Sequence, residues 1–202
     1  MLRVDLHLHS HYSHDGSSSL EQLIARAAEC GLDRLALTDH NTFEGAERFV
    51  QIAPGLAIAG EEVKTLEGEL IGLFITARVP PYLAPEDAMD VIHAMGGLTY
   101  VPHPLDPHRA HFRAERIVDL APRIDVIETY NAWCDQRANR AAADLARDLD
   151  KVAATGSDAH SAGELGRSWM EIEEYTTPAD FLEKLRHARH VVTSASGTGR
   201  RA

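Results

Sequence analysis

Short apolar runs alternate with longer amphipathic segments along almost the whole 202-residue chain. Each run is too short for a helix and is typical of a buried parallel strand. The runs are 2–6, 35–37, 56–59, 98–101, 125–127 and 152–154. The segments between and after them are predicted helices: 19–30, 42–53, 85–95, 114–120, 135–149 and 178–188. This alternation predicts an α/β fold with a mainly parallel sheet.

Local signals support several of these boundaries and indicate one irregularity. Ser19 with Gln22 is a capping-box pattern, Gly31 is a helix stop, and Pro178 suits a first helical turn. The segment 63–79 differs from the rest, because Gly68 separates two β-type runs, and it predicts an extra hairpin. We expect one domain over residues 1–195 and a flexible tail at 196–202.

Composition limits the classes of partner. Apolar residues make up 44% of the chain and charged residues 25%, which is ordinary for a globular protein with a core. The formal net charge of −11 disfavours unassisted binding to a long nucleic acid or an anionic membrane. Only two cysteines are present, Cys30 and Cys134, so a thiolate zinc site and a disulfide scaffold are not expected. No apolar segment is long enough to span a membrane, and we expect a cytoplasmic protein.

Metal-capable residues follow almost every apolar run. They fall in six short clusters: Asp5 to His9, Asp39-His40, Glu61-Glu62, His103, Glu128 to Asn131, and Asp158 to His160. In parallel α/β folds, ligands bind outside the carboxyl ends of the strands. The six clusters are therefore expected to converge on one pocket.

The first cluster indicates what that pocket binds. His7 and His9 are two positions apart, so on a strand their side chains point to the same face. Two neighbouring imidazoles in a core gain little without an acceptor or a metal. The whole set contains His, Asp and Glu but no Cys, which suits Zn²⁺, Mn²⁺ or Fe²⁺ in a hydrolytic site.

Six motifs in this order make the sequence resemble the polymerase-and-histidinol-phosphatase (PHP) superfamily of metal-dependent phosphoesterases. The motifs are DLHLHS with HDG (5–16), TDH (38–40), GEEV (60–63), PHP (102–104), ETYN (128–131) and GSDAH (156–160). The resemblance covers roughly residues 3–195 and is greatest to the small stand-alone members. It implies a distorted (β/α)₇ barrel with two to three divalent metal ions.

The resemblance also assigns ligands, residue by residue. One metal would be held by His7, His9, Glu62 and Asp158; a second by Glu62, which bridges, and His103; a third by Asp15, His40 and His160. Glu62 is preferred to Glu61 because the family pattern places its bridging glutamate two residues after the glycine, here Gly60. Asp39 is expected to orient a ligand histidine.

One position departs from the family pattern. Many members carry a further histidine in the hairpin strand that completes the second metal site, and Glu69 stands there in this chain. A carboxylate can ligate, which would retain the second metal with an altered preference. A solvated glutamate on a hairpin is the equally weighted alternative.

Three residues are candidate substrate contacts. Arg109 lies in the loop after the His103 strand and could pair with a phosphate. Asn131 and Arg167 are candidates by family position. His160, His40 or an acid from a neighbouring loop could protonate the leaving oxygen. Trp133 and Trp169 are expected to be packing residues rather than stacking platforms.

The function expected from these observations is hydrolysis of a phosphate monoester by a hydroxide that bridges two metals. We expect a small metabolite or nucleotide, such as a nucleoside 3′,5′-bisphosphate. Histidinol phosphate and a single-strand nuclease are alternatives within the same chemistry. A catalytically silent metal-binding regulatory domain is the alternative from another class. An amidohydrolase is disfavoured, because neither Lys64 nor Lys151 is placed to bridge metals. Oligomeric state does not follow from the sequence.

Overall fold

The computed structural model describes residues 1–193, and the predicted tail 196–202 lies outside the described residues. The described strands are β1 Leu2–Leu8, β2 Arg34–Leu37, β3 Ala57–Lys64, β4 Glu69–Leu73, β5 Leu98–Val101, β6 Val126–Asn131, β7 Val152–Gly156, β8 Ser168–Ile172 and β9 Arg189–Val192. The α-helices are α1 Leu20–Cys30, α2 Glu44–Ile52, α3 Pro85–Ala94, α4 Ala114–Leu120, α5 Gln136–Asp148 and α6 Pro178–Leu185. Two 3₁₀ turns lie at Ala121–Arg123 and Ala162–Glu164.

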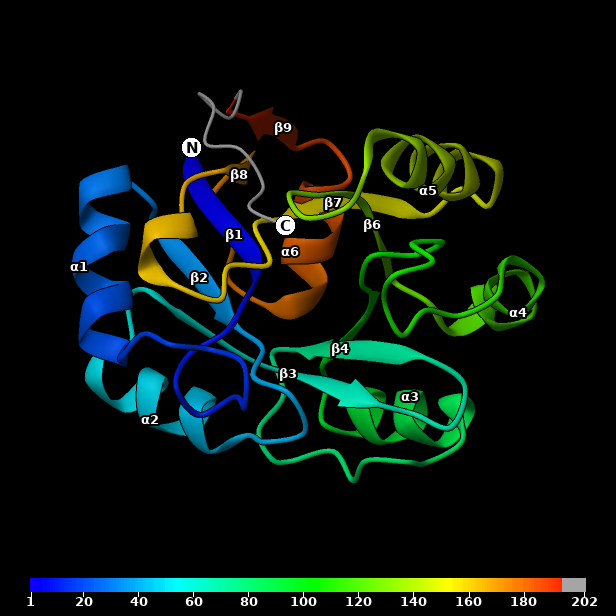
Figure 1. The fold of residues 1–202 in the computed structure, drawn as a ribbon, viewed down its shortest axis with the longest axis horizontal. Helices are drawn as coiled ribbons and strands as arrows, with labels where there is room; N and C mark the ends of the chain where they lie inside the picture. Colours follow the sequence, from blue (N-terminus) through cyan, green and yellow to red (C-terminus); the bar gives the residue numbers. More distant parts are fainter. Residues whose placement is uncertain (194–202) are drawn as a thin grey trace.

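The strands form one sheet that curls into a nearly closed barrel (Figure 1). Strands β1 to β7 follow each other in chain order around the sheet, and β8 and β9 extend it beyond β1. All pairs within β1–β7 are parallel except those of β4, which runs antiparallel to both β3 and β5. The structure is thus the predicted distorted barrel, with an antiparallel hairpin inserted.

The barrel closes where β1 meets the end of β7. Asp158 N donates to His7 O at 2.8 Å, and His9 N donates to Ala159 O at 2.8 Å. The first half of β1 instead pairs antiparallel with β8, from Leu2 to Val4. Strand β1 therefore changes partners along its length, and its register against β2 shifts between Asp5 and Leu8. Such irregularities re-aim side chains at barrel rims and beside active sites.

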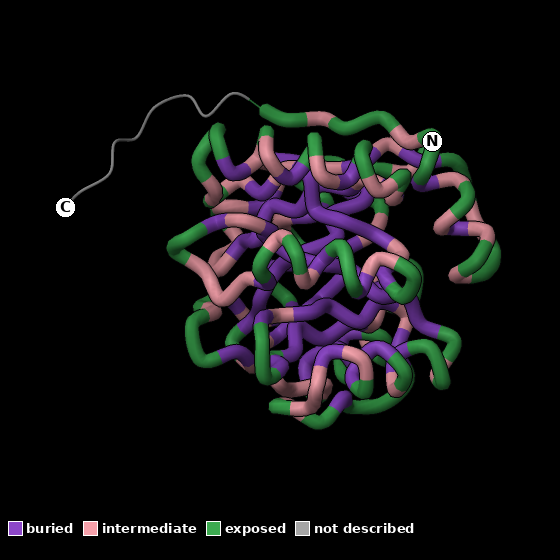
Figure 2. Tube along the Cα trace, turned by 90° about the vertical axis from the view of Figure 1, so that its right-hand side faces the viewer, coloured by how far each residue is buried: buried purple, intermediate pink, exposed green. Residues whose placement is uncertain are grey.

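Three buried apolar clusters hold the fold together, and Figure 2 shows buried chain at the centre with exposed chain outside. The first joins residues from almost every strand to Phe181 and Leu185 of α6. Figure 1 shows helix α6 in the middle of the ring of strands. The second packs α3, α4 and α5 against the sheet, and the third packs α1 and α2. None of the helices in residues 1–193 combines the length and apolar character needed to cross a membrane.

Helix boundaries follow the expected caps. Ser19 and Gln22 form the predicted capping box of α1, and Gly31 ends that helix at a φ of 66°. Asp135 caps α5, and Pro178 stands in the first turn of α6.

The inserted hairpin has different strand limits from those expected. Its second strand, β4, lies within the predicted segment 63–79, but its first strand is the whole of β3. Strand β3 pairs with β2 through Ala57–Ala59 and with β4 from Gly60 onwards. Glu61 and Glu62 consequently lie inside a strand rather than after one.

Candidate metal centre

Five polar side chains from four strands, or from the residues just after them, meet at the carboxyl end of the barrel. His7 comes from β1, His9 directly follows it, and Glu62 comes from β3. His103 follows β5, and Asp158 follows β7. All five side chains are buried, with at most 2% of each residue exposed. The expected convergence of strand ends on one place is therefore observed.

The first group of donors surrounds His7. Its Nε2 lies 3.3 Å from Nε2 of His9, 3.1 Å from Oε2 of Glu62 and 3.3 Å from Oδ1 of Asp158. His9 Nε2 lies 3.2 Å from the same Asp158 oxygen and 3.4 Å from Glu62 Oε2. These are the four residues that the resemblance assigns to one metal.

Glu62 reaches a second group through its other oxygen. Its Oε1 lies 2.9 Å from Nε2 of His103, and Glu69 Oε2 lies 3.8 Å from that nitrogen. His40, Glu62 and Glu69 can also bring one ligand atom each to within 4.8 Å of one another. Glu69 is thus directed to the cluster, which favours the ligating alternative over a solvated hairpin residue.

Glu61 lies on the other face of β3, as the choice between the two glutamates anticipated. Its Oε2 accepts a hydrogen bond from Val79 N at 2.8 Å, and Arg78 Nε lies 3.9 Å from Oε1. Burial raises the pKa of Glu61 to about 7, although the hydrogen bond from Val79 and the charge of Arg78 oppose this.

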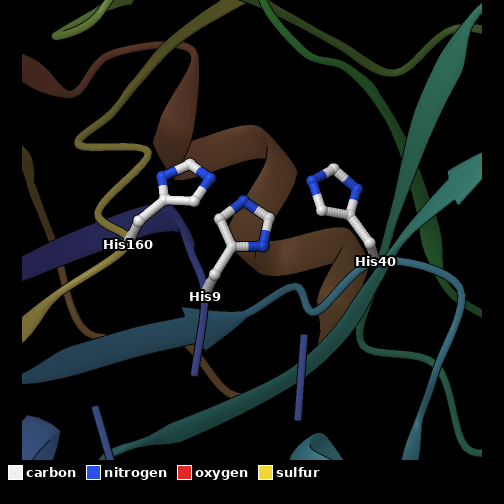
Figure 3. A group of neighbouring side chains, drawn as sticks. All are labelled: His9, His40 and His160. Atoms are coloured by element: carbon white, nitrogen blue, oxygen red, sulfur yellow. The ribbon is translucent and has the colours of Figure 1, made fainter. Parts of the chain in front are cut away.

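The third group consists of His9, His40 and His160. Figure 3 shows their rings side by side, with His9 between the other two. The ring centroid of His9 lies 4.6 Å from that of His40 and 4.5 Å from that of His160. Asp15 Oδ2 is 3.4 Å from His40 Nε2 and 3.2 Å from His160 Nε2. Asp15, His40 and His160 are thus close enough together to share one ion.

The donor set fits divalent cations. Nε2 of His7 faces Nε2 of His9, so one of the two must carry a proton unless a cation lies between them. Burial would lower the pKa of His7, but the charges of Asp158, Glu62 and Glu128 outweigh it and hold that pKa well above its usual value. The cluster therefore attracts positive charge. Nδ1 of His9 and Nδ1 of His103 are buried without a hydrogen-bond partner among the described residues, which leaves each ring anchored only through its Nε2.

A buried glutamate that the sequence interpretation left without a role supports this group. Glu128 Oε1 lies 3.1 Å from His7 Nδ1 and accepts from the Tyr100 hydroxyl at 2.8 Å. Its Oε2 accepts from His103 N at 2.6 Å and from Asn131 Nδ2 at 2.9 Å. Glu128 thereby fixes the ring of His7 and the backbone of His103, as carboxylates behind metal ligands do.

Asp39 does not contact a histidine ring, contrary to the expectation that it orients one. Its two oxygens accept hydrogen bonds from Ser10 N at 2.6 Å and Ser10 Oγ at 2.7 Å. Asp39 thus holds the backbone directly after His9. The carboxylate that contacts the ring of a proposed ligand is Glu128, and three of its four hydrogen-bond partners lie 25 or more positions away in the sequence.

Two residues of the centre have strained backbones. His103 has a φ of 29° and Asp158 a φ of 50°, and this left-handed region is uncommon for residues other than glycine. Strain of this kind persists where the surrounding structure enforces it, and it concentrates at functional sites.

Comparison with known proteins agrees with this geometry. The family model described as PHP domain matches residues 5–95, and the model described as PHP-associated matches residues 136–190. The uncharacterized protein MJ0417 of Methanocaldococcus jannaschii is 31% identical over 199 residues, which cover 92% of this chain and 79% of that protein. A second uncharacterized protein of that organism, MJ1587, is 33% identical over 145 residues, covering 65% of this chain and 83% of that protein.

The chain belongs to the PHP family. Its fold resembles that of a two-domain protein from Bacteroides vulgatus that contains a predicted PHP-like metal-dependent phosphoesterase. The two share 18% sequence identity at a TM-score of 0.76, over 95% of this chain and 64% of that one. The PHP barrel is thus supported by the sequence and by the fold.

The PHP centre opens into a cavity of about 510 Å³. The lining residues are Asp15, Ser17, Arg109, Trp133, His160, Ser161 and Glu164. Arg109 also reaches inwards, since its Nη2 lies 2.9 Å from Oδ2 of Asp158. A cationic group therefore links the cavity to the proposed ligand Asp158, and its role as a phosphate contact stays a prediction.

The other two candidate substrate contacts differ in position. Asn131 is 1% exposed, and its amide donates to Glu128 Oε2 at 2.9 Å and Asp158 Oδ2 at 3.2 Å. This placement assigns Asn131 to positioning the two carboxylates. Arg167 lies further out, 3.6 Å from Glu164 Oε1, with its guanidinium 5.4 Å from the ring centre of Trp133.

The expectation that both tryptophans are packing residues is wrong for Trp133, which is 47% exposed and lines the cavity. Trp169 is half-buried and packs against the third apolar cluster, and the Arg3 guanidinium lies over its ring.

Proposed function

We propose that this PHP protein hydrolyses the phosphate monoester of a small metabolite or nucleotide, such as a nucleoside 3′,5′-bisphosphate. The observation that carries the proposal is that three clusters of histidine and carboxylate side chains lie beside a cavity that Arg109 lines. A small phosphate ester matches a cavity of this size, whereas the net charge of −11 disfavours a long polyanion on the surface.

Two to three divalent ions, Mn²⁺, Zn²⁺ or Fe²⁺, are the proposed cofactors. His7, His9, Glu62 and Asp158 would hold the first; Glu62, His103 and Glu69 the second; Asp15, His40 and His160 the third. When bound, such ions supply Lewis-acid activation of water and neutralise phosphate charge.

The residues of the chain supply positioning and proton control. Arg109 offers a planar guanidinium to the phosphoryl oxygens, a geometry that suits phosphate. Its contact with Asp158 fixes the guanidinium beside the first group of ligands. Asp39 and Glu128 hold the backbone after His9 and the ring of His7, so the ligand atoms stay aligned.

We infer two alternative roles for His160, which exclude each other. Its Nδ1 lies 2.8 Å from the carbonyl oxygen of Asp158, which only accepts, so Nδ1 carries the proton. A neutral His160 then presents a lone pair at Nε2, as a third-metal ligand must. With two metals bound, a protonated His160 is the proposed donor to the leaving oxygen, because it lines the cavity.

The test measures activity and metal content together. Protein reconstituted separately with Mn²⁺, Zn²⁺ or Fe²⁺ is assayed on a broad panel of phosphate monoesters, with elemental analysis of each sample. His9→Ala and Asp158→Ala are expected to lose both bound metal and turnover. His187→Gln, at an exposed position outside the cluster, is the control. A wild-type protein that binds metal and hydrolyses nothing would favour the silent regulatory domain, and variants with full metal and activity would overturn the site.

A further inference from the structure

Trp133 is an exposed aromatic ring at the wall of the metal-centre cavity. It follows β6 and is 47% exposed, although the indole is among the largest apolar side chains. Its ring centroid lies 6.3 Å from that of His160, at an interplanar angle of 88°. A flat apolar surface therefore begins next to the imidazole of a proposed metal ligand.

The indole is held in this position from two sides. Trp133 N donates to Asn131 Oδ1 at 2.8 Å, and the amide nitrogen of the same Asn131 donates to Glu128 and Asp158. The Arg167 guanidinium lies over the ring, 5.4 Å from its centre, which is within the range of a cation–π contact. The backbone of Trp133 is thus linked through Asn131 to Glu128 and Asp158, and Arg167 covers part of the ring.

The surroundings of Trp133 do not form a protein-docking patch. The other exposed large hydrophobic residues among residues 1–193 are Met1, Val50, Leu66, Tyr82, Val118 and Val192. None of these six lines the cavity, whose other lining residues are polar or charged. A single aromatic ring among polar groups suits a small ligand that is flat at one end and anionic at the other.

We propose that Trp133 is a specificity-determining residue, on which an aromatic ring in the leaving group of the substrate stacks. The inference rests on the proposed phosphatase function and narrows its substrate class to phosphate esters that carry a flat ring. Arg109 lies on the phosphate side of the cavity, and Arg167 holds the outer side of the indole. Stacking of a base on an aromatic side chain tolerates different rings, because each offers a π-face.

The first experiment compares substrates that differ in the ring. Mn²⁺-loaded protein is assayed on the four nucleoside 5′-monophosphates and on ribose 5-phosphate, which has the same ester without a base. We expect kcat/KM for at least one nucleotide to exceed that for ribose 5-phosphate about 10-fold or more. Trp133→Ala should abolish this preference by lowering the nucleotide value alone, and Trp133→Phe should keep most of it. Trp169→Phe is the matched control.

The second experiment detects binding by fluorescence rather than by product formation. The chain has two tryptophans, so Trp169→Phe leaves Trp133 as the only indole fluorophore. We expect a nucleotide to quench its emission in the Mn²⁺-loaded protein, and ribose 5-phosphate to leave it unchanged.

The outcomes separate the two proposals. Hydrolysis of all five esters with equal efficiency, or an equal loss on all five in Trp133→Ala, would overturn the stacking role and leave the phosphatase intact. A protein that hydrolyses none of them, yet shows quenching by a nucleotide alone, would count against hydrolysis of 5′-esters and would still support aromatic recognition by Trp133. Equal quenching by a nucleotide and by ribose 5-phosphate would overturn the inference whatever the activity.

Discussion

Glu128 supports the centre from outside the set of proposed ligands. Its two oxygens form hydrogen bonds with His7 Nδ1, the Tyr100 hydroxyl, His103 N and the Asn131 amide. Glu128→Gln puts an NH₂ group where two of these donors point, so His7 or His103 must move. We expect the affinity for Mn²⁺ to fall about 10- to 100-fold.

The measurement is competition with a fluorescent chelator. Tyr100→Phe is the control, because it removes one donor and leaves the carboxylate, and it should cost less affinity than Glu128→Gln. A Glu128→Gln protein whose affinity matches the wild type would show that Glu128 does not position the ligands.

The buried carboxyl group of Glu61 makes the stability of the protein depend on pH. Burial raises the folded-state pKa of Glu61 to about 7 from an ordinary value of 4.5. The folded protein therefore favours the protonated acid, and stability is lost as pH rises from 4.5 through 7. The loss should reach about 3 kcal/mol above pH 8. Glu61→Gln keeps an acceptor for Val79 N and removes the charge.

The comparison uses urea unfolding of the wild type and Glu61→Gln at pH 5 and pH 8. Relative to the wild type, the variant should gain stability between the two pH values. A difference that is constant with pH would mean that Glu61 titrates normally in the folded protein.

The sequence predicts which residues meet more reliably than what each one contacts. Proposed ligands such as His7, Glu62 and Asp158 could be located because they follow or interrupt apolar runs, and strand ends converge in a barrel. The partner of Asp39 and the role of Glu128 could not be found in this way. They depend on hydrogen bonds across 29 and 121 positions of the chain.

Strand β3 is longer than its apolar run indicates, because two glutamates lie inside it. Glu61 and Glu62 interrupt the apolar pattern, so the sequence predicts that the strand ends at residue 59, whereas it continues to Lys64. Both carboxylates are fully buried. Val79 N donates a hydrogen bond to Glu61, and His103 Nε2 contacts Glu62. Strands β8 and β9 were not among the predicted runs, since polar residues alternate with apolar ones along β8 and β9 is mostly exposed.

The end of β7 requires a glycine where it approaches β1. A Cβ on Gly156 would lie 2.4 Å from Glu128 Oε1 and 2.5 Å from His7 Cβ. Gly156→Ala therefore must displace the ring of His7 or the carboxylate behind it. We expect a loss of about 1–3 kcal/mol in unfolding free energy, together with a lower metal content after reconstitution.

Gly55→Ala, in the turn between α2 and β3, is the control, since no atom lies within 4 Å of its added Cβ. Urea unfolding and elemental analysis follow both variants. Full metal content and unchanged stability in Gly156→Ala would mean that β1 and β7 can separate without disturbing the centre.

For the whole molecule, the proposed metal centre lies across the seam that closes the barrel. His7 lies in the first strand and His9 directly follows it, whereas Asp158 follows the last barrel strand, 149 positions after His9. Backbone hydrogen bonds from Asp158 N and His9 N close this seam at the rim. An ion held by these three residues would link the first and last strands of the barrel and neutralise buried carboxylates.

Metal binding should therefore raise the melting temperature of the whole domain. A ligand at 100 times its dissociation constant adds about 2.7 kcal/mol of stability, which corresponds to roughly 5–10 °C for a chain of this length. Calorimetry of Mn²⁺-loaded protein, of chelator-treated protein and of protein reloaded after chelation tests this. His187→Gln should keep the shift and His9→Ala should lose it, because only His9 belongs to the seam. A shift of equal size in His9→Ala would place the stabilising ion elsewhere on the molecule.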